Sequence, residues 1–328
     1  MSGNGIRIVY MGTPEFAVAP LKALANAGLD IRAVVTAPDK PAGRGKQLKS
    51  SAVKEFTLSE LNCPLLQPPN LKDPQFIEQL KSLDATLFIV VAFRMLPEAV
   101  WRIPKYGTFN LHASLLPQYR GAAPINWCII NGETETGVTT FLIDQEIDTG
   151  RIMLQAKTEI GTDDTAGTVH DRLMKLGAEL VIRTVESIKQ GTADAIDQSA
   201  FNIPEDQLKR APKIFREDCS INWNKSSREI HNLVRGLSPF PGAHTTLQKS
   251  DSEKLPLKIF ETKLLDETTG KDPGTVISHN RQFLKVATGD GCIGILSLQV
   301  AGKKRMSTAE FIRGFQDELN DLTFLSNS

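Results

Sequence analysis

The sequence predicts an α/β protein in two parts, a domain with a mostly parallel sheet and then a smaller β-rich domain. Its 328 residues exceed the roughly 100–200 residues of a typical single domain. In the first half, short β-rich runs alternate with helical patterns, which is typical of parallel strands joined by crossover helices. After Gly191 the pattern changes to short β-type segments separated by turn signals, which indicates antiparallel strands.

The strands predicted in the first half are Ile6–Gly12, Ile31–Ala37, the run within 84–92, Thr108–His112 and Val138–Asp144. The run Leu87–Val91 is apolar throughout, as expected of a strand that helices cover on both faces. The predicted helices are Pro14–Ala27 and Thr165–Lys189. The second is predicted because its apolar residues recur mostly at every third or fourth position.

The second half begins with a polar connector over residues 190–212. Beyond it the predicted strands are Leu257–Leu264, Gly274–Ser278, Phe283–Thr288 and Ile293–Val300. Gly289-Asp290-Gly291 is a turn signal between the last two. A small antiparallel barrel or sandwich accounts for this pattern.

The composition excludes several classes of protein. Apolar residues make up 41% and charged residues 23%, which is the ordinary globular range. Lys+Arg and Asp+Glu balance at 38 each, so a globally basic nucleic-acid coat is excluded. The apolar run Leu87–Phe93 is too short to cross a bilayer. The four cysteines form no CxxC pair, which predicts neither a zinc site nor a disulfide framework and suits a reducing cytoplasm.

The strand Thr108–His112 carries two polar side chains, Asn110 and His112, two positions apart. Residues two apart share one face of a strand, and in a sheet covered by helices such a pair needs a reason. One interpretation is a hydrogen-bonded buried pair. The other places both side chains in the crevice at the carboxyl ends of the strands, where His112 could move a proton and Asn110 could donate to an oxyanion.

The segment that follows, Ala113–Ile125, is predicted to be a long loop without regular structure, because it contains Pro117, Gly121 and Pro124. It also carries Leu115 and Leu116. Apolar side chains and free backbone groups suit a flat heterocyclic ligand, and a hydrophobic tuck under the sheet explains them equally well.

An acidic cluster, Asp144, Glu146 and Asp148, precedes Thr149-Gly150. A carboxylate beside His112 would stabilise the imidazolium. The alternative is a solvated acidic turn, and spacing alone does not select one of the three acids.

Other familiar site types are missing. The sequence has no GxGxxG, GxxxxGK[ST], HExxH or GxSxG motif, and no metal is expected. A basic, glycine-punctuated stretch lies between Thr36 and Lys54, with five cations against Asp39 alone. It is either a solvated loop or an arm that holds an anionic substrate. A second basic run is Lys303-Lys304-Arg305.

These residues resemble the formyltransferase family. The resemblance rests on Asn110-Leu111-His112, on Ser114–Pro117 continuing to Arg120–Ile125, and on Asp148-Thr149-Gly150. It extends over nearly the full length through Met11–Phe16, Pro38–Lys46, Val286–Gly291 and Ala301–Lys304. The first set is shared with relatives that formylate other amines. The basic loop and the C-terminal barrel point to the members that act on tRNA.

The resemblance implies a Rossmann-like catalytic domain over residues 1–189, a linker over 190–208 and an OB-fold-like β-barrel that binds tRNA over 209–328. The implied reaction moves the formyl group of 10-formyltetrahydrofolate, a co-substrate, to the α-amine of methionyl-initiator tRNA. The resemblance assigns catalysis to Asn110, His112 and Asp148. It assigns folate binding to Ser114, Leu115, Leu116 and Pro117, and tRNA binding to Arg44, Lys46, Lys303, Lys304 and Arg305.

The chain departs from the family pattern at one place. The family usually has Ala-Tyr-Gly and two further residues before Leu-Pro, whereas here Ala92-Phe93-Arg94-Met95 precedes Leu96-Pro97. This segment helps wall the folate pocket in the family.

Two alternatives stay open. The first is a related folate-dependent formyltransferase that acts on a sugar or ribonucleotide amine, and the second is a non-catalytic RNA-binding protein. The expected protein is a cytoplasmic monomer with no membrane partner.

Overall fold

The computed structural model describes residues 5–42, 47–248, 254–279, 282–314 and 322–326. The chain forms two compact units. The first contains Met1–Gly121, Thr136–Thr158 and His170–Arg210, and the second contains Ala122–Glu135, Glu159–Val169 and Ala211–Ser328. Each unit is therefore assembled from segments that are separated in the sequence.

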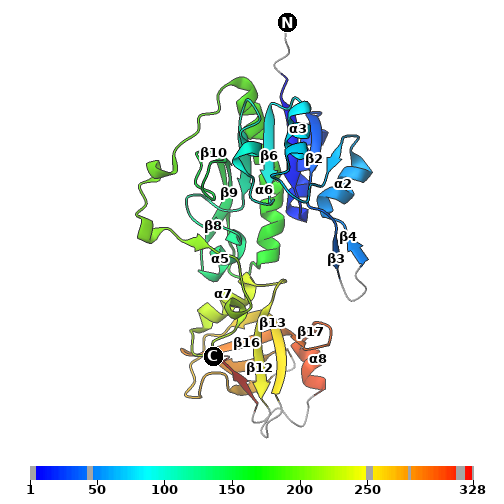
Figure 1. Ribbon diagram of the computed structural model, residues 1–328. Coiled ribbons are helices and arrows are strands. Elements are labelled where there is room, and N and C mark those ends of the chain that lie inside the picture. The colour runs from blue at the N-terminus through cyan, green and yellow to red at the C-terminus, as the bar shows by residue number, and fades with distance from the viewer. Residues whose placement is uncertain (1–4, 43–46, 249–253, 280–281, 315–321, 327–328) are drawn as a thin grey trace. The chain divides into compact units, whose positions relative to one another are not determined.

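The first unit is built on a seven-stranded sheet of order β10-β9-β7-β6-β1-β2-β5 (Figure 1). Its strands are β1 (Arg7–Gly12), β2 (Asp30–Val35), β5 (Leu65–Leu66), β6 (Leu87–Val91), β7 (Thr108–His112), β9 (Glu135–Leu142) and β10 (Ile152–Glu159). The strands from β7 to β5 are parallel, and β9 runs antiparallel to β7. The predicted mostly parallel sheet is confirmed.

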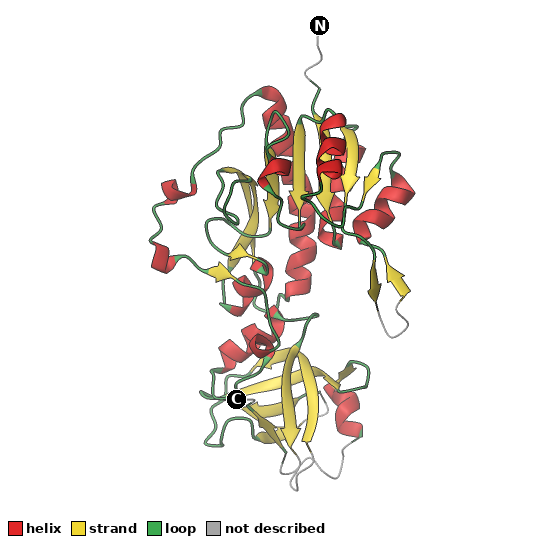
Figure 2. Ribbon diagram, in the orientation of Figure 1, coloured by secondary structure: helices red, strands yellow, loops and turns green. Residues whose placement is uncertain are grey.

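Helices flank this sheet (Figure 2). They are η1 (Glu15–Ala17), α1 (Val18–Asn26), α2 (Ala52–Glu60), α3 (Pro74–Ser82), α4 (Glu98–Trp101) and α6 (Ala166–Gln190). All five residues of β6 are buried, as its apolar run predicted. The close packing of α6 on β7 requires a glycine at position 177, because a Cβ there would lie 2.7 Å from Cδ2 of Leu111.

Several short elements lie in the first unit and in the segments where the chain passes into the second. A two-stranded ribbon joins β3 (Lys40–Ala42) to β4 (Gln47–Lys49), and β8 (Arg120–Gly121) pairs with β11 (Arg210–Ala211). The connector holds η2 (Gln198–Phe201) and η3 (Glu205–Gln207). The prediction that Pro124 prevents regular structure was wrong, because helix α5 (Pro124–Ile130) begins there. At the first position of a helix no N–H is needed, so proline is favoured.

The second unit is a nearly closed antiparallel barrel, as predicted. Its strands are β12 (Ala243–Gln248), β13 (Lys254–Leu264), β14 (Val276–His279), β15 (Leu284–Ala287), β16 (Cys292–Val300), β17 (Met306–Ser307) and β18 (Thr323–Leu325), in the order β14-β15-β16-β13-β12-β18 with β17 beside β16. The two ends of this order meet, since the Phe324 N–H donates to the Gly274 carbonyl at 2.8 Å and the Val276 N–H to the Leu322 carbonyl at 3.0 Å.

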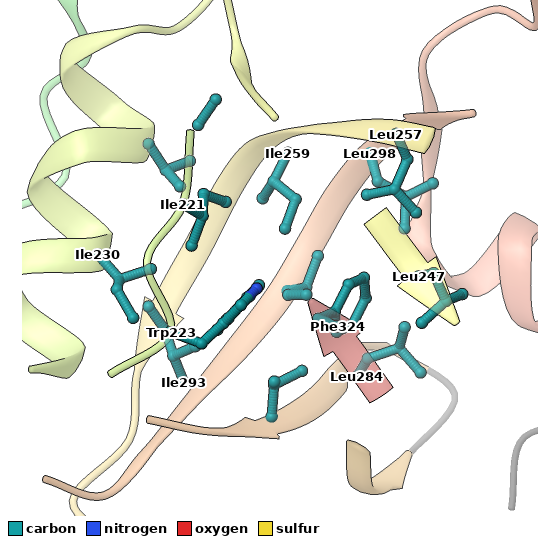
Figure 3. Packing of buried hydrophobic residues seen from close by; sticks show 14 of the residues in the cluster. Ile221, Trp223, Ile230, Leu247, Leu257, Ile259, Leu284, Ile293, Leu298 and Phe324 are labelled. Atoms are coloured by element: carbon teal, nitrogen blue, oxygen red, sulfur yellow. The ribbon is translucent and has the colours of Figure 1, made fainter. Parts of the chain in front are cut away.

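The barrel core is centred on Trp223 and Phe324, whose ring centroids lie 5.2 Å apart (Figure 3). The buried indole of Trp223 donates from Nε1 to Thr245 Oγ1 at 3.0 Å. Helix α7 (Ser227–Gly236) packs against the same core through Ile230 and Val234. The unit also contains η4 (Glu217–Cys219) and α8 (Thr308–Arg313).

Helix α7 begins with a capping box. The Ser226 side chain accepts from the Glu229 N–H, and the Glu229 carboxylate accepts from the Ser226 N–H at 3.1 Å. The hydrogen bond from the Ser226 side chain, with help from Lys225, lowers the pKa of Glu229 to about 2.

Within the described ranges, none of the helices combines the length and apolarity that a membrane span requires.

Candidate functional site

The candidate site is centred on the carboxyl end of β7. Phe109 and Leu111 are buried in the sheet, while Asn110 and His112 share the opposite face of the strand. The Asn110 side chain is half-buried and hydrogen bonds to none of the residues that the structure describes. Its amide is therefore free to donate to a ligand.

His112 is 6% exposed and is held through one ring nitrogen. Its Nε2 lies 2.8 Å from the carbonyl oxygen of Tyr119. A carbonyl oxygen only accepts, so Nε2 carries the proton and Nδ1 of the neutral ring keeps its lone pair. Nδ1 lies 3.8 Å from Oδ2 of Asp148, which is too far for a hydrogen bond but close enough to stabilise an imidazolium.

Only Asp148 of the three candidate acids lies at His112. Asp148 adopts a left-handed backbone conformation with φ of 58°. Its Oδ2 accepts a hydrogen bond from the Gly121 N–H at 2.9 Å. Asp144 is exposed and accepts from the Thr149 hydroxyl at 2.8 Å, and Glu146 is also exposed. These two acids form a solvated turn, the alternative considered for the whole cluster.

The stretch expected to bind folate is part of the loop that follows β7, and it is mostly buried. Ser114 and Leu116 are 0% and 1% exposed, and Leu115 is half-buried. The Leu116 side chain packs with Phe141 and Ile152, and its carbonyl accepts from Gln155 Nε2 at 2.8 Å. Pro117 is buried as well. The stretch is thus a fixed wall beside His112, with Leu115 its most accessible member.

The first basic stretch is only partly visible, because Arg44 and Lys46 lie outside the described residues. The charge of Lys54, at the end of the stretch, is neutralised by Asp39, since the Lys54 Nζ lies 2.6 Å from Oδ2 of Asp39. Lys40 and Lys49 are exposed and stand opposite each other across the β3–β4 pair. Like charges in that arrangement repel, so an anion would stabilise the pair.

The second basic run forms the exposed turn between β16 and β17. Arg305 is held against the barrel, since its guanidinium carbon lies 4.8 Å from the centre of the Phe260 ring and Nε donates to Ser297 Oγ at 2.8 Å. Lys303 and Lys304 are exposed.

The departure at residues 92–97 has a clear structural role. The Arg94 guanidinium donates to the carbonyls of Pro68 and Pro69 at 2.8 and 3.1 Å and lies 5.3 Å from the Phe93 ring centre. Burial lowers the pKa of Arg94. The side chain ties the end of β6 to the loop after β5.

In the described ranges, no group of three His, Cys, Asp or Glu residues could hold a metal ion.

Sequence reasoning missed the backbone groups of the site. The Tyr119 carbonyl orients His112, and the Gly121 N–H holds Asp148. Neither group has a side-chain signature, so no sequence signal could have identified it.

Comparison with known proteins shows which family the chain belongs to. Residues 6–185 match the family model described as formyl transferase, and residues 213–316 match the formyl transferase C-terminal domain. The chain is 52% identical over 96% of its length to a methionyl-tRNA formyltransferase of Azobacteroides pseudotrichonymphae, covering 97% of that protein. It is 50% identical to the methionyl-tRNA formyltransferase of Bacteroides fragilis, covering 96% of this chain and 97% of that protein.

Solved structures share the fold at lower identity. A sugar 3N-formyl transferase, WlaRD, superposes with a TM-score of 0.64 at 22% identity, covering 92% of this chain and all of its own. HypX from Aquifex aeolicus superposes with a TM-score of 0.63 at 18% identity, covering 96% of this chain and 48% of its own. The curated relatives share about half of their residues with this chain over nearly its full length. The chain therefore belongs to the family of methionyl-tRNA formyltransferases.

Proposed function

We propose that this protein transfers the formyl group of 10-formyltetrahydrofolate to the α-amino group of methionyl-initiator tRNA, as a cytoplasmic enzyme of translation initiation. The observation that carries the proposal is the arrangement of His112 and Asp148. The buried His112 is held in one tautomer by the Tyr119 carbonyl, and its Nδ1 lies 3.8 Å from Oδ2 of Asp148. The amide of Asn110, which bonds to none of the residues that the structure describes, lies on the same strand face. A proton carrier and an oxyanion donor are what formyl transfer to an amine requires.

The reaction uses these groups in turn. The neutral amine attacks the formyl carbon, a C–N bond forms, and the carbonyl oxygen becomes anionic. The Asn110 amide donates to that oxygen. Nδ1 of His112, the nitrogen with the free lone pair, takes the proton from the new ammonium while Asp148 stabilises the imidazolium. The oxyanion then re-forms the carbonyl, the bond between the formyl carbon and the donor nitrogen breaks, and the leaving nitrogen takes the proton from Nδ1 of His112.

The proposed division of labour follows the boundaries expected from the sequence. Residues 1–189 catalyse, with Ser114–Pro117 walling the folate site, residues 190–208 connect, and residues 209–328 bind tRNA. Support for a polyanionic substrate comes from the exposed Lys40–Lys49 pair, which belongs to the same basic stretch of the sequence as Arg44 and Lys46. Lys303 and Lys304 offer further phosphate contacts, with Arg305 fixed beside them.

The direct test is formylation of alternative amines. Purified protein and 10-formyltetrahydrofolate are incubated with methionyl-tRNA or with a nucleotide-linked amino sugar, and the products are separated. We expect N-formylmethionyl-tRNA and no formylated sugar. Equal or faster formylation of the sugar would overturn the tRNA assignment.

Point variants test the tRNA contacts better than truncation, because α5 depends on α7: Asn126 Nδ2 donates to the Gly236 carbonyl at 2.7 Å. Replacing Lys303 and Lys304 together by Ala should raise KM for the tRNA and reduce the salt slope of binding by about 1.4–1.8. Lys271→Ala, at an exposed position of the same unit, is the control. An unchanged slope would remove this turn from the interface.

A further inference from the structure

Gln198 lies in the polar connector, yet it is 5% exposed. Its side-chain oxygen accepts from Arg120 Nε at 3.0 Å and Nη2 at 2.6 Å. Its side-chain nitrogen donates to the carbonyls of Asp148 at 2.9 Å and Gly150 at 2.8 Å. An amide offers two donors and two acceptor positions, so Gln198 uses its full capacity on residues far away in the sequence.

The two carbonyls belong to an unusual turn. Asp148 adopts φ of 58°, a region that non-glycine residues seldom occupy. Gly150 is packed so closely that a Cβ would lie 1.7 Å from the Leu142 carbonyl oxygen. The amide of Gln198 bonds the turn at both of these residues, so it favours the backbone conformation that aims the Asp148 side chain.

The other half of the amide reaches the same carboxylate by a second route. Arg120 precedes Gly121, whose N–H donates to Asp148 Oδ2 at 2.9 Å. By holding Arg120, Gln198 also holds the backbone donor of the carboxylate. Both contacts that orient Asp148 therefore converge on one side chain.

The connector is itself fastened where it delivers Gln198. Ile196 and Ile152 exchange two backbone hydrogen bonds of 2.8 Å. The Asp197 side chain then accepts from the Ser199 N–H at 2.9 Å and caps η2. The position of Gln198 is thus fixed by the backbone pair at Ile196 and by the bond between the Asp197 side chain and the Ser199 N–H.

We infer that Gln198 is a positioning residue for formyl transfer, acting by holding the Asp148 carboxylate at His112. The inference rests on the proposed function, because it needs Asp148 to act in the reaction.

The test is a double-mutant cycle between Gln198→Leu and Asp148→Asn in the full chain. Gln198→Leu should lower kcat by about 10–100-fold, since misplacement by about 1 Å can cost that much, with KM for both substrates within about twofold. Because Gln198 acts through Asp148, the double variant should be no slower than Asp148→Asn alone. Gln207→Leu, an exposed glutamine of the same connector, is the matched control and should keep its kcat.

The outcomes separate the two claims. If Asp148→Asn keeps wild-type kcat, the proposed catalytic role fails. If Asp148→Asn is slow but Gln198→Leu is not, or if the two losses multiply, the inference about Gln198 fails and the proposed function stands. Should Gln198→Leu not fold, Gln198→Asn replaces it in the cycle, because the shorter amide cannot reach Arg120 and both carbonyls together. A wild-type kcat for that variant would equally overturn the inference.

Discussion

The two units of the molecule each contain a buried histidine, and the two histidines differ in the group that faces Nδ1. His112 and His231 are 6% and 4% exposed. Both place Nε2 near a backbone carbonyl, that of Tyr119 at 2.8 Å and that of Thr162 at 3.1 Å. The Nδ1 of His231 completes its bonding with the Thr262 hydroxyl at 2.9 Å, whereas the Nδ1 of His112 faces a carboxylate at 3.8 Å.

The comparison shows that burial and one hydrogen bond do not mark a functional histidine. His231 has no nitrogen left for a substrate. It lies among Arg235, Arg228 and Asp163, and burial lowers its pKa. His112 keeps one nitrogen with a lone pair and has a carboxylate to stabilise its charged form. On its own strand lies the Asn110 amide, which bonds to none of the described residues. The second ring nitrogen distinguishes a chemical role from a structural one.

The largest expected effect separates the two rings by activity. His112→Ala should lower kcat by about 10²–10⁴ because the proton carrier is lost. His231→Ala should leave kcat within about twofold once the protein is folded. Single-turnover formylation of methionyl-tRNA measures both. Near-normal turnover in His112→Ala would place both histidines in the structural class.

The next effect extends the comparison to two amides. Asn110→Ala should lower kcat by about 10²–10³, as for other oxyanion donors, with little change in melting temperature, because no described residue bonds to its side chain. Asn232→Ala is the contrasting variant, since Asn232 Oδ1 accepts from Arg235 Nε at 2.9 Å in the interior. It should lose stability and keep kcat. If Asn110→Ala unfolds the protein instead, the side chain has a structural role and the assignment of Asn110 as the oxyanion donor fails.

A smaller effect concerns stability alone. His231→Ala should lower the free energy of unfolding by about 1–3 kcal/mol, because the Thr262 hydroxyl and Thr162 carbonyl lose their partner. Urea unfolding of the full chain measures the loss. His244→Ala is the control, because that ring is only half-buried and its Nε2 lies 2.8 Å from one carbonyl, that of Arg216. A loss at His244 as large as that at His231 would contradict the account.

The smallest effect is a pH dependence. Because burial depresses the pKa of His231 in the folded state, the unfolded chain binds this proton more readily. Its contribution to stability is therefore complete above about pH 6.5, the unfolded value, and is lost as pH falls through the folded pKa. Unfolding midpoints of wild type and His231→Gln between pH 8 and pH 5 should converge toward the acid end. Parallel curves would refute the prediction.

Local pattern was enough to predict much of the scaffold. Strand β7 has the predicted bounds, and α6 and β16 differ from their predictions by one residue at most. Strand β10 was missed because its side chains are mostly half-buried and show no clean alternation. Helix α7 was missed although Ser226 and Glu229 give a capping-box signal and the apolar residues that follow recur at helical spacing, at positions 230, 233, 234 and 237.

The site was predictable only where side chains share a strand. The alternation of side chains along β7 was enough to place Asn110 and His112 on one face. It could not select Asp148 among three acids, because that choice depends on a left-handed residue and on the Gly121 N–H. Gln198 had no signal at all, since a single glutamine in a polar connector is indistinguishable from a solvated one.

The interlocked assembly of the second unit limits how such proteins can exchange parts during evolution or engineering. Helix α5 belongs to the unit that contains α7, although about a hundred residues separate them in the chain. The fit between them is close, since a Cβ on Gly236 would lie 2.6 Å from Cγ1 of Ile130. A hybrid joined once within the connector would set one parent's α5 against the other parent's α7. A barrel can be transplanted intact only if Ala122–Glu135 and Glu159–Val169 travel with it.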